Sequence, residues 1–185
     1  MKKIIIGLDI DGPTVNSMNF FFFVLIFGKR IAKIFRIKNK IKFLEKYFDL
    51  VWIVMEKFNI FFPGSKGSKI FFKYLKEKDF YFVFISARTK RFMLYTLKQV
   101  EKITKRKNCV LLEEKEENLE FFAKTLDFFV DDVPGFLDTI KETNPKCKTF
   151  HFLLKKDQYT RDVPHIQIKS LCELIPYIEV VSGCQ

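Results

Sequence analysis

Residues 3–12, KIIIGLDIDG, carry the strongest structural signal in this sequence. Residues 3–10 are rich in β-branched side chains, and apolar and polar residues do not alternate, so we predict a strand buried on both faces. Asp9 and Asp11 stand at its carboxyl end, and Gly12 allows the backbone to turn tightly there. Ligands of open α/β sheets bind outside the carboxyl ends of the strands, so we expect a binding site at this point.

Similar apolar runs recur along the chain, with helical patterns between them. Further strands are predicted at residues 80–85, 109–112, 128–130 and 149–154, and helices at 68–78, 90–105, 116–125, 135–143 and 170–178. Strands that alternate with helices favour right-handed crossovers and a mainly parallel sheet. The sequence therefore predicts a three-layer α/β/α fold with a Rossmann-like parallel sheet.

One long connection interrupts this alternation. No strand pattern occurs from residue 14 to about residue 63, where amphipathic stretches at 30–48 and 49–58 precede a Phe-Pro-Gly-Ser turn. We interpret residues 15–63 as a helical insertion of two to four helices, and residues 1–14 and 64–185 as the core domain. The many aromatic residues of this insertion are most simply explained by packing, although stacking on a nucleobase is an alternative.

Composition limits the possible partners and locations. The chain has 185 residues and a net charge of +11, which favours anionic partners, but its lysines are dispersed, so a nucleic-acid arm is unexpected. The four cysteines lack the spacing of a metal site. The apolar run at 20–27 is too short to span a bilayer, and the N-terminus lacks a signal-peptide cleavage site. We expect a cytoplasmic protein without a membrane partner.

Polar residues follow three of the predicted strands and define a candidate site. Asp9 and Asp11 follow the first strand, Ser86 follows the second, and Asp131 and Asp132 follow the fourth. The carboxylates suit a magnesium site, and the Ser86 hydroxyl with the following amide suits a phosphate. Each feature alone could be an Asp-Gly turn, a helix N-cap or a surface turn, but together they indicate one site.

This set resembles the motifs of the haloacid dehalogenase (HAD) superfamily, which has DxDG after the first strand, Ser or Thr after the second and paired acids after the fourth. The resemblance implies a phosphohydrolase in which Asp9 is the nucleophile and Asp11 the general acid and base. Gly12, Ser86 and Ala87 would bind phosphate. Asp9, Asp11, Asp131 and Asp132 would form the Mg²⁺ site, and residues 15–63 would be a small C1-type cap.

The resemblance also implies a lysine that neutralises the phosphate and the nucleophile. Lys115, before the helix predicted at 116–125, fits this role best, and Lys124, late in that helix, is the alternative. Pro13 departs from the superfamily pattern and removes a backbone N–H, a loss that Thr14 could partly replace.

A narrower resemblance concerns substrate. The Phe-Pro-Gly turn at 62–64, Ser-Ala-Arg at 86–88, Val-Asp-Asp at 130–132 and residues 157–161 are similar to the deoxy-type 5′-nucleotidase (5′(3′)-deoxyribonucleotidase) branch. This implies hydrolysis of nucleoside monophosphates. The alternatives are a phosphatase for a sugar or other small phosphomonoester, and a non-catalytic HAD-like protein that binds nucleic acid or another protein.

Overall fold

The structure is a computed structural model that describes residues 4–58, 60–88, 90–106, 109–112, 115–154 and 164–183. Its internal contacts divide the chain into two compact units. The core unit consists of Met1–Asn16 and Pro63–Gln185, and the helical unit consists of Ser17–Phe62.

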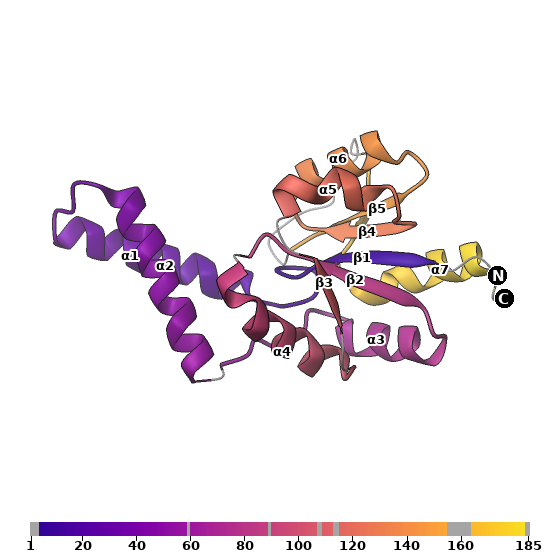
Figure 1. Ribbon diagram of the computed structural model, residues 1–185, viewed down its shortest axis with the longest axis horizontal. Helices are drawn as coiled ribbons and strands as arrows, with labels where there is room; N and C mark the ends of the chain where they lie inside the picture. Colours follow the sequence, from indigo (N-terminus) through magenta and orange to yellow (C-terminus); the bar gives the residue numbers. More distant parts are fainter. Residues whose placement is uncertain are drawn as a thin grey trace. The chain divides into compact units, whose positions relative to one another are not determined.

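The core unit contains a parallel sheet of six strands in the order β3-β2-β1-β4-β5-β6 (Figure 1). The strands are β1 (Ile5–Asp9), β2 (Tyr81–Ile85), β3 (Val110–Leu112), β4 (Phe128–Asp131), β5 (Lys148–Phe152) and β6 (Ile166–Ile168). This arrangement confirms the predicted α/β fold class. β6 was not predicted, because a three-residue strand with Gln167 at its centre has no continuous apolar run.

Helices cover both faces of this sheet. α5 (Lys115–Ala123) and α6 (Pro134–Thr143) lie on one face, and α3 (Ser68–Glu77), α4 (Met93–Thr104) and α7 (Ile175–Ser182) lie on the other (Figure 1). Short 3-10 helices at Lys90–Phe92 and Leu171–Leu174 lead into α4 and α7. The helix predicted at 170–178 is thus a 3-10 helix followed by α7, and it ends at Ser182, four residues later than predicted.

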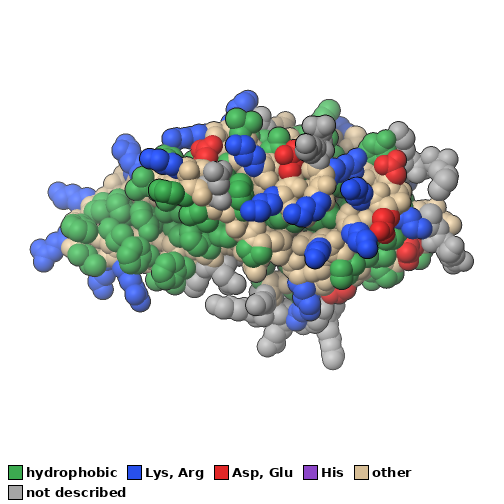
Figure 2. Space-filling view, turned by 90° about the horizontal axis from the view of Figure 1, so that it is seen from below, with side chains coloured by type: hydrophobic (Ala, Val, Ile, Leu, Met, Phe, Trp, Pro, Cys, Tyr) green, Lys and Arg blue, Asp and Glu red, His purple; other side chains and the backbone are tan. Residues whose placement is uncertain are grey.

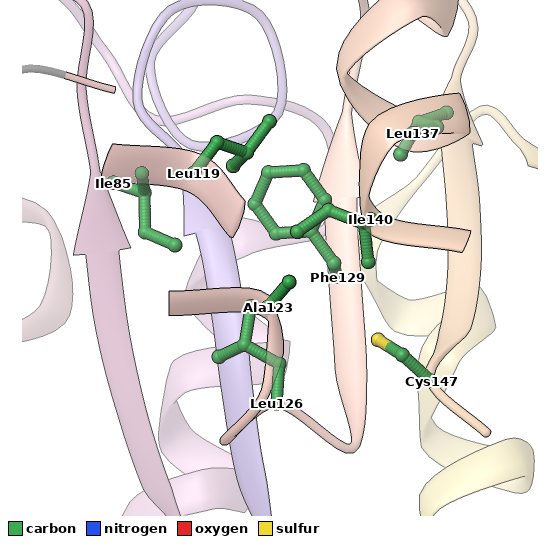
Figure 3. Close-up of a cluster of buried hydrophobic side chains, with 8 residues drawn as sticks. All are labelled: Ile85, Leu119, Ala123, Leu126, Phe129, Leu137, Ile140 and Cys147. Atoms are coloured by element: carbon green, nitrogen blue, oxygen red, sulfur yellow. The ribbon is translucent and has the colours of Figure 1, made fainter. Parts of the chain in front are cut away.

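A buried hydrophobic cluster joins the sheet to α5 and α6 (Figure 3). Phe129 of β4 packs among side chains from both helices, and Gly7 of β1 leaves room for them, since a Cβ there would lie 2.9 Å from Phe129 and Leu126. Burial of each large apolar side chain contributes about 1.5–3 kcal/mol. This cluster fixes α5 over β1 and β4, next to the carboxyl ends of both strands.

The strand order reverses between β1 and β4. From β1 the chain adds β2 and β3 on one side, and it then returns to place β4 on the other side. The connections leave the carboxyl ends of β1 and β4 in opposite directions, and open α/β sheets bind ligands at such a switch point. The acidic residues that follow β1 and β4 lie at this point of the sheet.

The helical unit is a pair of helices, α1 (Met18–Ile34) and α2 (Lys40–Lys57). The amphipathic stretch at 30–48 spans the end of α1 and the start of α2, and the chain leaves helical geometry between them. Arg36 adopts a left-handed conformation with φ 48°, and the Asn39 side chain caps α2 by accepting a hydrogen bond from the Lys42 N–H at 3.1 Å. Among the described residues, no helix is both long enough and apolar enough to cross a membrane.

Candidate active site

Asp9 and Asp131 project from neighbouring strands toward the same layer of helices. β1 and β4 pair in register, with Gly7 opposite Phe129 and Leu8 opposite Val130. Because side chains alternate along a strand, Asp9 shares the face of Gly7, and Asp131 shares the face of Phe129. Both carboxylates therefore face the α5 layer, and both are buried, Asp131 completely.

Lys115, the first residue of α5, reaches both of these carboxylates. Its Nζ lies 2.7 Å from Asp9 Oδ1 and forms an ion pair with Asp131 Oδ2. The side chain is almost completely buried, and its ammonium group lies 4.1 Å from the centre of the Phe136 ring. Lys124, the alternative from the sequence, is exposed and lines a different cavity with Ile5 and Asp127. The structure therefore places Lys115, and not Lys124, beside Asp9.

Asp132 completes a cluster of acids with Asp9 and Asp131. One carboxylate oxygen from each lies within 4.8 Å of the others. Gly12 permits this approach, since a Cβ at residue 12 would lie 2.8 Å from the Asp132 carboxyl carbon, and its φ of 99° favours glycine. The Gly12 N–H donates to the Val15 carbonyl at 2.9 Å, so in this structure Gly12 shapes the turn.

Burial and mutual repulsion make these acids hard to ionise. Burial, with repulsion from Asp131, raises the pKa of Asp9 to about 8 against the opposing effect of Lys115. Burial also raises the pKa of Asp131 to about 6 and, with repulsion from Asp9, that of Asp132 to about 7. Burial alone would lower the pKa of Lys115, but the two carboxylates beside it raise it overall. Additional positive charge here would therefore be strongly stabilised.

Asp11 is held apart from this cluster by Arg88. The guanidinium donates two hydrogen bonds to the Asp11 carboxylate, from Nε at 2.8 Å and from Nη2 at 2.6 Å. Arg88 is itself fixed by α4, because its Nη1 donates to Thr96 at 3.2 Å and to Gln99 at 3.0 Å. The sequence motif that contains Arg88 predicted no role for it. The bidentate pair holds Asp11 in one orientation.

Ser86 lies at the same edge of the sheet, after β2. Its hydroxyl oxygen accepts the Arg88 N–H at 3.1 Å, and its carbonyl accepts the Lys115 N–H at 3.4 Å. Ser86 is buried, whereas Ala87 is exposed. Ser86 therefore joins the Arg88 loop to the start of α5, in addition to any contact with phosphate.

Thr14 and Ser65 stabilise the turn that follows β1. The Thr14 hydroxyl donates to the Asp9 carbonyl at 2.7 Å, and the Ser65 hydroxyl donates to the Pro13 carbonyl. These bonds fix the backbone on both sides of Pro13, which has no N–H of its own to donate.

The chemistry of the acidic cluster fits a hard divalent cation. Oxygen ligands from carboxylates are those that Mg²⁺ prefers. Four carboxylates meet two cationic side chains at this edge, so the fully ionised group has a formal charge of −2, which one divalent ion would balance. The six residues are Asp9, Asp11, Asp131, Asp132, Arg88 and Lys115.

A cavity of about 430 Å³ borders the turn at Gly12. It lies within the core unit, and its lining combines apolar side chains from the end of β5 with two lysines and a few small polar residues. The lining residues are Gly12, Asn16, Ser65, Lys66, Phe152, Leu153, Leu154 and Lys169. This volume is within the usual range for small-molecule pockets, about 300–1,000 Å³.

Comparison with solved structures shows the fold of HAD-like hydrolases. A protein of Thermotoga maritima, named as a candidate beta-phosphoglucomutase, is similar with a TM-score of 0.65 and 12% identity over 96% of this chain and 99% of its own. A HAD phosphatase from Thermococcus onnurineus gives a TM-score of 0.63 and 12% identity, over 96% and 98% of the two chains.

A HAD family hydrolase from Deinococcus radiodurans, solved with bound phosphate and sodium, gives a TM-score of 0.63 and 10% identity, over 97% of this chain and 96% of its own. No family profile and no curated protein sequence matches this chain. The fold implied by the HAD resemblance is therefore confirmed, through structural and not sequence similarity.

Proposed function

We propose that this protein is a phosphomonoester hydrolase that forms an aspartyl-phosphate on Asp9. The observation that carries the proposal is the contact of the buried Lys115 with Asp9 and Asp131 at the switch point of the sheet. Asp9, Asp131, Asp132 and the backbone carbonyl of Asp11 would hold Mg²⁺. When bound, this ion would offset the repulsion between the carboxylate nucleophile and the anionic phosphate.

The side chains divide the reaction into two displacements at phosphorus. Asp9 attacks the phosphorus, and the bond to the leaving oxygen breaks while Asp11 supplies that oxygen with a proton. Asp11 then removes a proton from water, which attacks the phosphorus, releases inorganic phosphate and restores the Asp9 carboxylate. Lys115 stabilises the charge on the phosphoryl oxygens in both steps, and the Ser86 hydroxyl with the amide of Ala87 binds the same group.

Nucleoside monophosphates are the substrates that we propose. The cavity beside Gly12 supports this, because Phe152, Leu153 and Leu154 provide apolar walls that suit a base or sugar ring. The similarity of several motifs to those of 5′-nucleotidases also supports it, although residues 157–161 lie outside the described residues. We propose that the helical unit acts as the C1-type cap that selects the leaving group. A sugar phosphate is the competing substrate class.

The test is phosphate release from a panel of nucleoside monophosphates and sugar phosphates, with Mg²⁺ and with EDTA. We expect magnesium-dependent release that Asp9→Asn abolishes and that the control Asp49→Asn, at an exposed position of α2, leaves unchanged. Undiminished turnover by Asp9→Asn would refute the mechanism. Preference for sugar phosphates would refute only the assignment of substrate.

A further inference from the structure

The helical unit exposes an apolar surface that its own packing does not use. In α1, the small or short side chains Val24, Gly28 and Ala32 are buried. Gly28 faces α2, since a Cβ there would lie 2.8 Å from Tyr47 and 2.9 Å from Leu44. These residues recur every four positions and therefore lie on one side of the helix, which identifies the packing face.

A second apolar stripe of α1 lies beside this packing face. Phe23, Phe27 and Ile34 fall within a narrow angle of the helix, and they are 65%, 49% and 72% exposed. The rings of Phe23 and Phe27 stack with their centroids 6.2 Å apart. A continuous stripe of aromatic side chains exposed to this extent indicates a surface that contacts a protein or a membrane.

α2 presents a similar stripe. Leu50, Val54 and Phe58 recur every four positions at its carboxyl end and are exposed, whereas the neighbouring Met55 is buried. Figure 2 shows hydrophobic side chains gathered over the helical unit, with Lys and Arg side chains projecting around them. We call the two stripes together the apolar surface of the helical unit.

The charge of this unit indicates what the surface contacts. Residues 17–62 contain nine Lys and Arg but only three Asp and Glu, so this quarter of the chain carries +6 of the total charge of +11. All nine cationic side chains are exposed. At 3.6 residues per turn, Arg30 lies beside the exposed stripe of α1, and Lys57 lies beside that of α2. A second copy of the same unit would bring like charges together, whereas an anionic surface would be attracted.

We propose that the helical unit binds the surface of membranes that contain anionic phospholipids. Aromatic and aliphatic side chains on one side, with lysines beside them, are the features by which amphipathic helices lie in the interface without spanning the bilayer. We predicted no membrane partner from the lack of a segment long and apolar enough to span a bilayer. Binding at the interface requires no spanning helix, and the proposal does not depend on the proposed catalytic activity.

The test is flotation of the full-length protein with vesicles of phosphatidylcholine containing about one third phosphatidylglycerol. We expect binding at least about tenfold stronger than to phosphatidylcholine alone, and weaker binding when salt is raised from about 0.1 M to about 0.5 M.

Two paired variants test the surface itself. The double variant Phe23→Ser with Phe27→Ser should weaken vesicle binding by about tenfold or more. Leu94→Ser, at a position of α4 that is 73% exposed, should not. Arg30→Glu with Lys57→Glu provides a second test that leaves the apolar residues intact, and circular dichroism confirms that each variant is folded.

Three results would overturn the proposal. The first is equal binding to neutral and anionic vesicles, or no binding to either. The second is unchanged binding by both double variants. The third is a stable dimer, detected by analytical ultracentrifugation, that the Phe23→Ser and Phe27→Ser substitutions dissociate, since the surface would then be an interface between two copies of the chain.

Discussion

Replacement of Lys115 by Met tests the electrostatic arrangement of the site most directly. Met preserves much of the length of the side chain and its apolar surroundings but removes the ammonium group that Asp9 and Asp131 share. Loss of one partner from a buried ion pair costs about 3–5 kcal/mol. Loss of a single group that stabilises charge in the transition state lowers kcat about 10²–10³-fold, and we expect a decrease of that size for Lys115→Met.

Folding stability should fall by less than the full cost of breaking the pair. With a pKa of about 8, Asp9 is already mostly protonated at pH 7 in the metal-free protein. Since Lys115 opposes that rise, removal of the lysine keeps Asp9 protonated and leaves no unpaired charge on it. Steady-state phosphate release measures the decrease in kcat, and urea unfolding of the metal-free protein measures the decrease in folding stability. The variant should therefore remain folded while it loses activity.

Lys124→Met is the matched control, because Lys124 is exposed and lies just after α5. It should retain activity within about twofold of the unmodified protein, as expected for surface substitutions. The reasoning would be refuted if the two variants had equal activity, or if Lys124→Met were the inactive one. Either result would mean that the ion pair with Asp9 has no part in turnover.

Three further predictions concern the same edge of the sheet. Gly12→Ala should weaken Mg²⁺ binding measured by calorimetry, because its Cβ would displace the Asp132 carboxylate, whereas Gly135→Ala, with no atom within 4 Å, should not. Arg88→Lys should lower kcat about tenfold with little change in KM, because one ammonium cannot hold Asp11 through two parallel bonds. The raised pKa of Asp9 means that the folded, metal-free protein binds more protons than the unfolded chain between about pH 4 and pH 8, so its melting temperature should fall across that window, and Mg²⁺ should restore it most at pH 8.

The strands that carry the site could be predicted from sequence because each is a buried apolar run that ends in polar residues. β1, β2 and β4 lie within a residue or two of their predicted positions. The order of the strands could not be predicted in this way, since periodicity does not specify which strands are neighbours. The pairing of β1 with β4 brings Asp9 beside Asp131, and it depends on the crossover from β3 that places α5 on the opposite face.

The lysine that contacts Asp9 could be predicted from its position along the chain, but not from its charge. The chain has 33 Lys and Arg residues, so a single lysine has no distinctive local pattern. Its location at the first residue of α5 matters because α5 packs over β1 and β4, which directs the start of the helix toward their carboxyl ends. Lys124 lies nine residues later, just past the end of α5, where it is exposed.

Asp11 shows why two acids with the same local pattern can have different partners. Strand alternation predicts that Asp9 and Asp11, two residues apart, face the same side of the sheet. β1 ends at Asp9, however, and the turn through Gly12 directs Asp11 to Arg88, whose guanidinium is fixed by α4 on the opposite face from α5. Asp9 therefore has Lys115 as its partner, and Asp11 has Arg88. In the proposed mechanism, this separation lets Asp9 attack phosphorus while Asp11 exchanges a proton with the leaving group. Arg88 lies 77 positions from Asp11 along the chain, so local sequence spacing could not identify it as the partner of Asp11.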